Sequence, residues 1–116
     1  MTGFITTILS MKVIYADHLE DLLYIDFDEG WKLPKRAKYP INVVKKFQSQ
    51  CALLEELENS TKMYKYPTLR PHQLHWNLDW FLGIDLTKWR RIEIKILEEW
   101  VLEIVKVYRI GNHYER

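Results

Sequence analysis

The sequence contains a single cysteine, Cys51, so no disulfide can form within the chain, a pattern typical of reducing compartments. It has no hydrophobic run close to the ~18–20 residues of a membrane-spanning helix. Residues 1–10 lack the positive charge of a secretion signal. We therefore expect a cytoplasmic protein with no membrane partner, in which residues 1–10 are a flexible extension and Met11 is an alternative start.

An excess of one charge is also missing, because 17 Lys and Arg residues balance 16 Asp and Glu residues and leave a net charge of +1. This balance does not favour a uniformly basic nucleic-acid-binding surface. The charges are nevertheless segregated, since an acidic stretch over residues 17–29 is followed by a basic one over residues 32–46. Hydrophobic residues make up 47% of the chain, and its 116 residues predict one domain with a buried core.

The second half of the chain predicts an antiparallel β-meander. Polar and apolar residues alternate, as a half-buried sheet requires. In one segment three isoleucines alternate with Arg91, Glu93 and Lys95, which we expect on the outer face of the strand. In the last segment Glu103 and Lys106 fall on opposite faces, which predicts either a bulge or a charge at the core rim. The four expected strands span roughly residues 69–75, 79–86, 89–97 and 101–110.

The first half predicts a strand and two helices. Residues 11–16 are rich in β-branched and aromatic side chains and are expected to join an edge of the sheet. A short helix is expected over residues 18–27 with Asp17 as its N-cap. Pro40 suits the first turn of a longer helix that runs to about Glu58 with one apolar stripe.

After this helix, Pro67 favours a non-helical connector over residues 62–68. The order of strand, helices and meander predicts an α+β fold over residues 1–116, with the helices packed on one face of the sheet.

Residues 70–92 read R-P-H-Q-L-H-W-N-L-D-W-F-L-G-I-D-L-T-K-W-R-R-I. This stretch resembles the segment R-x-H-x-L-K-G-x-x-x-G-x-W-S-I-x-V-x-x-x-W-R-I of the RelE/HigB-like toxins of type II toxin–antitoxin systems, without a gap. The resemblance extends from the helix near Pro40 to the C-terminus, where His113 matches the histidine of the family's D-Y-H ending. It implies the RelE-like fold.

The resemblance also implies a metal-independent endoribonuclease that cuts mRNA on the ribosome and inhibits translation, with no cofactor. Such chemistry needs a base for the 2′-OH, a cation for the phosphorane and an acid for the leaving oxygen. Arg91 is expected to bind the scissile phosphate. Four further side chains are expected to move protons and orient the substrate: His72, His75, His113 and Tyr114.

Basic residues around these positions are candidates for salt-sensitive contacts with RNA. They are Lys35, Arg36, Lys45, Lys46, Lys88 and Arg90. The partner that the resemblance implies is a HigA-like antitoxin with a helix-turn-helix, assembled with the toxin as a heterotetramer.

Three other interpretations remain open. A metal site at His72, His75 and His113 is disfavoured, because two residues three apart on a strand do not share a face. A catalytically impaired RelE-fold module, acting by binding an antitoxin or RNA, would account for the lysine that is replaced by His75 and for the altered ending at Asn112. An unrelated interaction domain would use its exposed aromatic residues as an interface.

Overall fold

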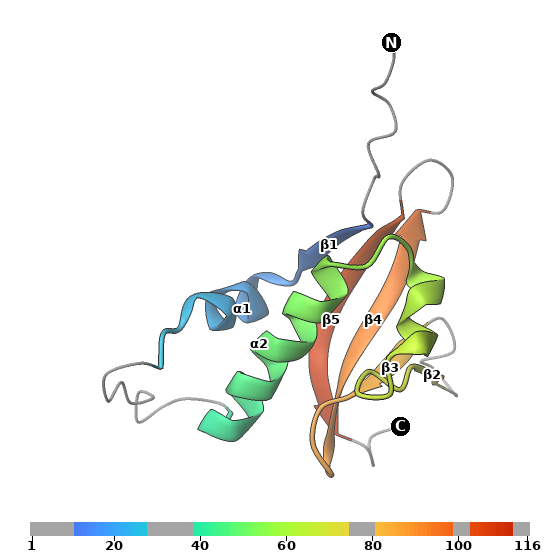
Figure 1. Cartoon of the computed structure of the whole chain (residues 1–116). Coiled ribbons are helices and arrows are strands. Elements are labelled where there is room, and N and C mark those ends of the chain that lie inside the picture. Colours follow the sequence, from blue (N-terminus) through green and yellow to red (C-terminus); the bar gives the residue numbers. More distant parts are fainter. Residues whose placement is uncertain (1–10, 28–38, 75–80, 99–102, 113–116) are drawn as a thin grey trace.

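The computed structural model describes residues 11–27, 39–74, 81–98 and 103–112. Its centre is a five-stranded sheet of order β1-β5-β4-β3-β2 (Figure 1). Strands β2 to β5 form an antiparallel meander, and β1 pairs with β5 in parallel. The predicted meander, the edge strand and the α+β class are therefore confirmed. The strands are β1 (Lys12–Tyr15), β2 (His72–Gln73), β3 (Leu82–Asp85), β4 (Arg90–Glu98) and β5 (Ile104–Asn112).

In the part of the chain that the structure describes, four helical elements accompany the sheet, and two of their starts differ from expectation. Asp17 lies inside the first helix, whose N-cap is Ala16 without a side-chain hydrogen bond, so the predicted Asp17 cap is wrong. Pro40 is the N-cap of the long helix rather than part of its first turn. The elements are α1 (Asp17–Glu20), η1 (Asp21–Tyr24), α2 (Ile41–Glu55) and η3 (Ser60–Lys65).

The η3 helix occupies a segment for which no helix was expected. The side chain of Asn59 accepts a hydrogen bond from the backbone N–H of Thr61, which caps the first turn. Pro67 comes two residues after the last helical residue and therefore removes no helical hydrogen bond. At its start, the backbone N–H and Oγ of Ser60 donate to the carboxylate of Glu103, each at 2.6 Å, which ties η3 to the beginning of β5.

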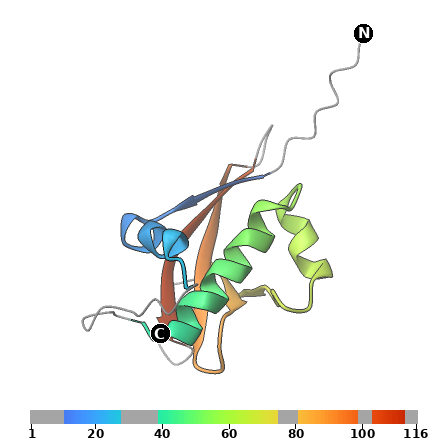
Figure 2. The ribbon, with the colours of Figure 1, turned by 60° about the vertical axis from the view of Figure 1, so that its left-hand side comes forward.

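The core lies between α2 and one face of the sheet, and Figure 2 shows α2 running across that face. The predicted apolar stripe is buried from Val44 through Phe47 to Leu54, whereas Ile41 at the helix start is exposed. On the sheet side the isoleucines of β3 and β4 have no exposed surface at positions 84, 92 and 94. This packing directs the alternate residues of β3, β4 and β5 to the opposite face of the sheet.

Two glutamines of α2 fix the segments around it. Buried Gln50 donates from Nε2 to the carbonyls of Thr68 at 2.6 Å and Asp85 at 2.8 Å. Gln48 donates in the same way to the carbonyls of Leu22 and Ile25. Gln50 therefore holds the end of β3 against the segment that leads into β2, directly behind the candidate site.

The β4–β5 pairing has two register irregularities, at Glu93/Ile94 and at Ile96/Glu98, and the first is a bulge in the last strand, one of the two alternatives predicted there. Glu93 pairs with Arg109 and Ile94 with Val107, so Tyr108 is an extra residue in β5. The bulge changes the alternation of β5 and brings Arg109 beside Glu93 on the same face. In the described part of the chain, none of the helices is both long and apolar enough to cross a membrane.

Candidate functional site

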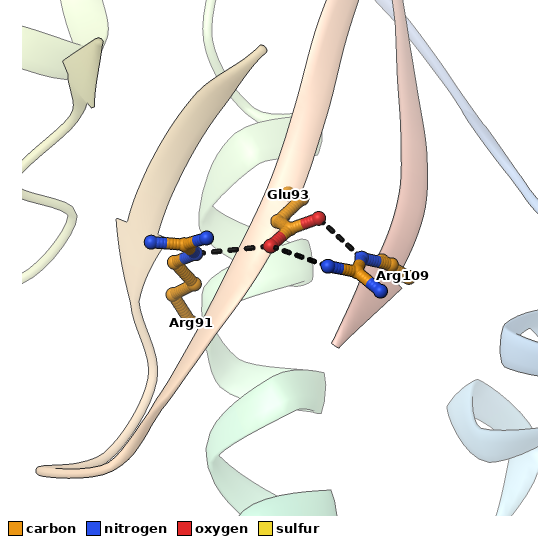
Figure 3. Close-up of polar contacts among 3 residues, drawn as sticks. All are labelled: Arg91, Glu93 and Arg109. Carbon is orange, nitrogen blue, oxygen red and sulfur yellow. Dashed lines mark hydrogen bonds and ion pairs between the residues drawn. The ribbon is translucent and has the colours of Figure 1, made fainter. Parts of the chain in front are cut away.

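The candidate site lies on the sheet face opposite α2, which we call the polar face. Cross-strand partners point to the same side of a sheet, so the register defines which residues share this face. Figure 3 shows its central residues in front of the strands, with α2 behind them. The polar face is formed by Gly83, Asp85, Arg91, Glu93, Lys95, Lys106, Arg109 and Gly111.

Glu93 is at the centre of this face and lies between two arginines (Figure 3). Its Oε2 accepts a hydrogen bond from Nε of Arg91 at 2.9 Å, and its Oε1 accepts one from Nε of Arg109. Glu93 is 1% exposed and Arg91 is 7% exposed, whereas the side chain of Arg109 is 42% exposed. The alternation predicted for β4 is confirmed, and the outer face of the strand is shielded from solvent at Arg91 and Glu93.

The two arginines share one carboxylate, so the cluster keeps an excess positive charge. A buried carboxylate is tolerated because its oxygens accept charge-assisted hydrogen bonds. The same bonds fix the orientation of Arg91, whose guanidinium lies on the β3 side of Glu93 (Figure 3). A preorganised cation of this kind suits an anionic ligand.

Two glycines make room for this arrangement. Gly111 is the register partner of Arg91, and a Cβ at position 111 would overlap the carboxylate of Glu93. A Cβ at position 83 would lie 2.9 Å from Nε2 of His72 and 2.9 Å from Cδ2 of Leu74. A Cβ atom does not normally come this close to another side chain. A side chain at position 83 or 111 would therefore displace His72 and Leu74 or Glu93, respectively.

His72 extends the polar face onto β2. It pairs with Gly83, which in turn pairs with Glu93, so the three residues form one row across the sheet. Nδ1 of His72 lies 3.0 Å from the carbonyl oxygen of Arg70. Because a carbonyl only accepts, Nδ1 carries the proton in this contact, and in the neutral ring Nε2 keeps its lone pair. Arg70 presents this carbonyl from a left-handed backbone conformation, with φ of 41°.

The structure therefore brings together two of the five predicted catalytic residues, His72 and Arg91, in neighbouring rows of the polar face. The other three, His75, His113 and Tyr114, lie outside the described residues, as do Lys35 and Arg36.

The remaining predicted RNA-binding residues are divided between different surfaces. Lys45 and Lys46 are on α2, which covers the other face of the sheet, and Nζ of Lys45 lies 5.4 Å from the ring of Phe27. Arg90 stands over the ring of Tyr39 at 5.3 Å. Lys88 is exposed in the β3–β4 turn. The polar face itself carries two further lysines, Lys95 and Lys106, which are cross-strand partners.

The sequence interpretation missed Arg109 and did not assign a role to Glu93. Glu93 could have been found from its position two residues after Arg91, which places both on one side of a strand. Arg109 could not have been found from the sequence. Strict alternation along β5 places it on the core face, and only the bulge at Tyr108 brings it to the polar face.

Two titratable groups on the other side of the sheet have shifted pKa values. Burial raises the pKa of the Cys51 thiol to about 12, the hydrogen bond with Tyr15 opposes this increase, and the nearby Glu55 adds to it. Burial and the nearby Cys51 raise the pKa of the Tyr15 phenol, whose O–H donates to Glu55. Within the described ranges, no three His, Cys, Asp or Glu side chains are grouped to hold a metal ion.

Comparison with solved structures identifies the fold. One similar structure is a YoeB/ParE toxin from Agrobacterium tumefaciens, with a TM-score of 0.53 and 14% sequence identity over 90% of this chain and 100% of that chain. Another is the YoeB–YefM complex from Staphylococcus aureus, with a TM-score of 0.50 and 14% identity over 90% of this chain and 98% of that chain. No family model and no curated protein matches the sequence. The protein thus has the RelE-like fold of these toxins, as its sequence resemblance predicted.

Proposed function

We propose that this protein is the toxin of a type II toxin–antitoxin system and cleaves mRNA without a metal ion. The observation that carries the proposal is the polar face, where an imidazole with a free Nε2 and a fixed guanidinium lie in neighbouring cross-strand rows. The toxin fold of the similar structures supports the same conclusion.

His72 and Arg91 each suit one step of RNA cleavage. Nε2 of His72 takes the proton from a ribose 2′-OH, and the resulting oxygen attacks the adjacent phosphorus. Arg91 stabilises the negative charge that develops on the phosphorane oxygens. The bond from phosphorus to the 5′-oxygen then breaks, and the products are a 2′,3′-cyclic phosphate and a 5′-hydroxyl.

The leaving 5′-oxygen needs a proton donor. We assign this role to His113 or Tyr114, with His75 as an additional cation near the phosphate. These three residues lie outside the described part of the chain, so the assignment rests on the resemblance to RelE/HigB-like toxins.

The chemistry on the polar face also indicates how RNA would be held. Arg91, Arg109, Lys95 and Lys106 outnumber the two carboxylates on this face, Glu93 and Asp85. Contacts between these cations and phosphates would release counterions, so RNA binding should weaken steeply as salt is added. We propose that mRNA on the cytoplasmic ribosome is the substrate.

The proposed partner is an antitoxin with a helix-turn-helix, which forms a heterotetramer with the toxin and covers the polar face. A solved structure of the same fold is a complex of YoeB with YefM. A partner that neutralises this face would carry acidic side chains, because the excess charge of the face is positive.

The test is induction of the chain alone in bacteria, beside Arg91→Ala and His72→Ala. Wild-type protein should arrest growth and leave cleaved messages. Each substitution should lower cleavage by about 10²–10³-fold, the usual cost of removing one preorganised stabilising or proton-transfer group. Glu93 keeps Arg109 as a partner in Arg91→Ala, so this variant should remain folded.

A matched control is Lys12→Ala, which removes an exposed cation from β1, at the other edge of the sheet from β2. It should arrest growth as wild type does. Equal activity of Arg91→Ala and wild type would contradict the proposed mechanism.

A second function is favoured by one observation, namely that the guanidinium of Arg91 already donates to Glu93. An arginine committed to a buried carboxylate suits a catalytically impaired module that acts by binding RNA or an antitoxin. Harmless wild-type expression with intact messages, together with retained RNA binding, would establish this alternative.

A further inference from the structure

A pocket of about 690 Å³ opens beside His72, at the β2 edge of the sheet. Its walls come from three places: the end of η3, the segment from Arg70 to His72, and the β3–β4 turn with Lys88. A pocket of this volume is large enough for a small-molecule ligand or one nucleotide. Since His72 is one of its walls, whatever fills the pocket lies next to the proposed general base.

The pocket offers flat aromatic surface to solvent. Tyr64 is 64% exposed and Tyr66 is 41% exposed, and both line the pocket together with Pro67 and Pro71. Exposed aromatic rings that line one cavity are a stacking surface for nucleobases, and each base–aromatic contact tolerates any base because every base has a π-face.

Charged groups at the rim complete the features that a nucleotide needs. Arg70 and Lys88 supply two cations, and Asp85 supplies one carboxylate. Nη1 of Arg70 lies 3.4 Å from Oδ2 of Asp85, and the side chain of Arg70 is 75% exposed, so this ion pair is weak and the guanidinium remains accessible. The excess positive charge favours an anionic ligand. A nucleotide fits better than an acidic peptide side chain, because only the nucleotide also has a base that can stack on the tyrosines.

The backbone at Arg70 is held in an unfavourable conformation next to this pocket. Arginine rarely adopts a φ of 41°, and such strain is typically maintained by surrounding contacts at functional positions. Here the N–H of Leu69 donates to the carbonyl of Tyr66, and the N–H of Asp85 donates to the carbonyl of Leu69. The strained turn orients His72 through the carbonyl of Arg70, and Arg70 itself lines the pocket.

From these observations we propose that the pocket binds one nucleotide of single-stranded RNA, next to the phosphate that is cleaved. Its base stacks on Tyr64 and Tyr66, and its phosphate contacts Arg70 and Lys88. This inference deepens the proposed nuclease function and rests on it for the position of the cleaved bond. The pocket would then determine which segment of the message reaches His72.

The test is binding of a mixed-sequence 2′-O-methyl RNA decamer, which lacks the attacking 2′-OH, measured by fluorescence anisotropy with purified full-length protein. The double variant Tyr64→Ala/Tyr66→Ala should bind between about fivefold and a hundredfold more weakly than wild type. The double variant Tyr64→Phe/Tyr66→Phe keeps both rings and should bind as wild type does. Tyr24→Ala removes an even more exposed ring at the end of η1, outside the pocket, and should also have no effect.

Salt dependence gives an independent measurement of the phosphate contact. Lys88→Ala should weaken binding at low salt and reduce the slope of log affinity against log salt by about one. Circular dichroism of each variant establishes that it is folded, which is expected because the substituted side chains are exposed.

Two results would overturn the pocket inference: wild-type affinity in the Tyr64→Ala/Tyr66→Ala variant, or no decamer binding by wild type at up to about 1 mM protein, above the usual range of nonspecific binding. In the first case, loss of antitoxin binding by the same variant would indicate that the pocket takes a protein partner instead. If the tyrosines are needed for RNA binding but messages stay intact in cells, the pocket stands and the nuclease proposal fails. If the variant cleaves and binds as wild type, the nuclease proposal stands and the pocket fails.

Discussion

Arg91 and Glu93 are two residues apart on β4, and their side chains form an ion pair of 2.9 Å that is almost completely shielded from solvent. Glu93 also binds Arg109 of β5, so a single carboxylate joins the two central strands of the polar face. This relationship makes Glu93 a positioning residue for Arg91, and it leads to the first prediction.

Glu93→Gln should destabilise the protein by about 3–5 kcal/mol, because it removes the charge that compensates buried Arg91. Arg109→Ala should cost clearly less, since its side chain is partly exposed and Glu93 keeps Arg91 as a partner. Urea unfolding curves of both variants measure the difference. Equal losses of stability in the two variants would contradict the arrangement in Figure 3.

Gly83→Ala should lower activity more than it lowers stability. The new Cβ would lie 2.9 Å from Nε2 of His72, an exposed ring that can move away, and 2.9 Å from a methyl group of Leu74. We expect message cleavage to fall at least tenfold, with a loss in unfolding free energy of about 1–3 kcal/mol from the crowding of Leu74. The measurements are growth arrest on induction and thermal unfolding of the purified variant.

The double variant Gly83→Ala/His72→Ala separates the two effects. Removal of the imidazole should restore part of the lost stability but none of the lost activity. Full activity in Gly83→Ala would show that His72 does not act from its position over this glycine.

Gln50→Leu should cost about 2–4 kcal/mol, because the carbonyls of Thr68 and Asp85 each lose their donor inside the protein. Leucine keeps most of the side-chain volume, so the loss reports the hydrogen bonds rather than a cavity. Ser49→Ala, at the neighbouring exposed position on α2, is the control and should change stability by less than about 0.5 kcal/mol. Denaturant titration of both variants gives the comparison.

Cys51 should make the fold less stable in alkali. The folded protein holds the thiol protonated up to a pKa of about 12, whereas the unfolded chain ionises at the ordinary value of 9.0. The unfolded state therefore loses its proton first, and the contribution of Cys51 to stability decreases from pH 9 upward at roughly 1.4 kcal/mol per pH unit until it levels off near pH 12. Cys51→Ala should show a shallower decline between pH 9 and 11 in unfolding experiments at several pH values.

The pKa of Tyr15 is raised mainly by burial and partly by Cys51, so the difference between the two curves reports Cys51 together with its effect on Tyr15. Parallel curves would mean that the thiol ionises equally in the folded and unfolded states. Alkylation by iodoacetamide at pH 8 should correspondingly be slow for native protein and fast in urea.

Local pattern was sufficient to predict the meander and its two faces. Alternation along residues 89–97 placed the isoleucines in the core and Arg91 with Glu93 on the other side, because successive side chains of a strand must point in opposite directions. The apolar stripe of α2 could equally be predicted from the three- and four-residue spacing of its apolar positions. These features depend only on neighbours in the sequence.

The site itself depended on contacts between distant segments, and the sequence could not supply them. The bulge at Tyr108 determines that Arg109 reaches Glu93, and Gly83 leaves the space that His72 occupies from another strand. The carbonyl of Arg70 determines which nitrogen of His72 carries the proton. Composition and alternation thus determined which residues are polar and on which face they lie, whereas only tertiary structure decided that Arg91 is buried and paired, because burial is set by what packs from elsewhere in the chain.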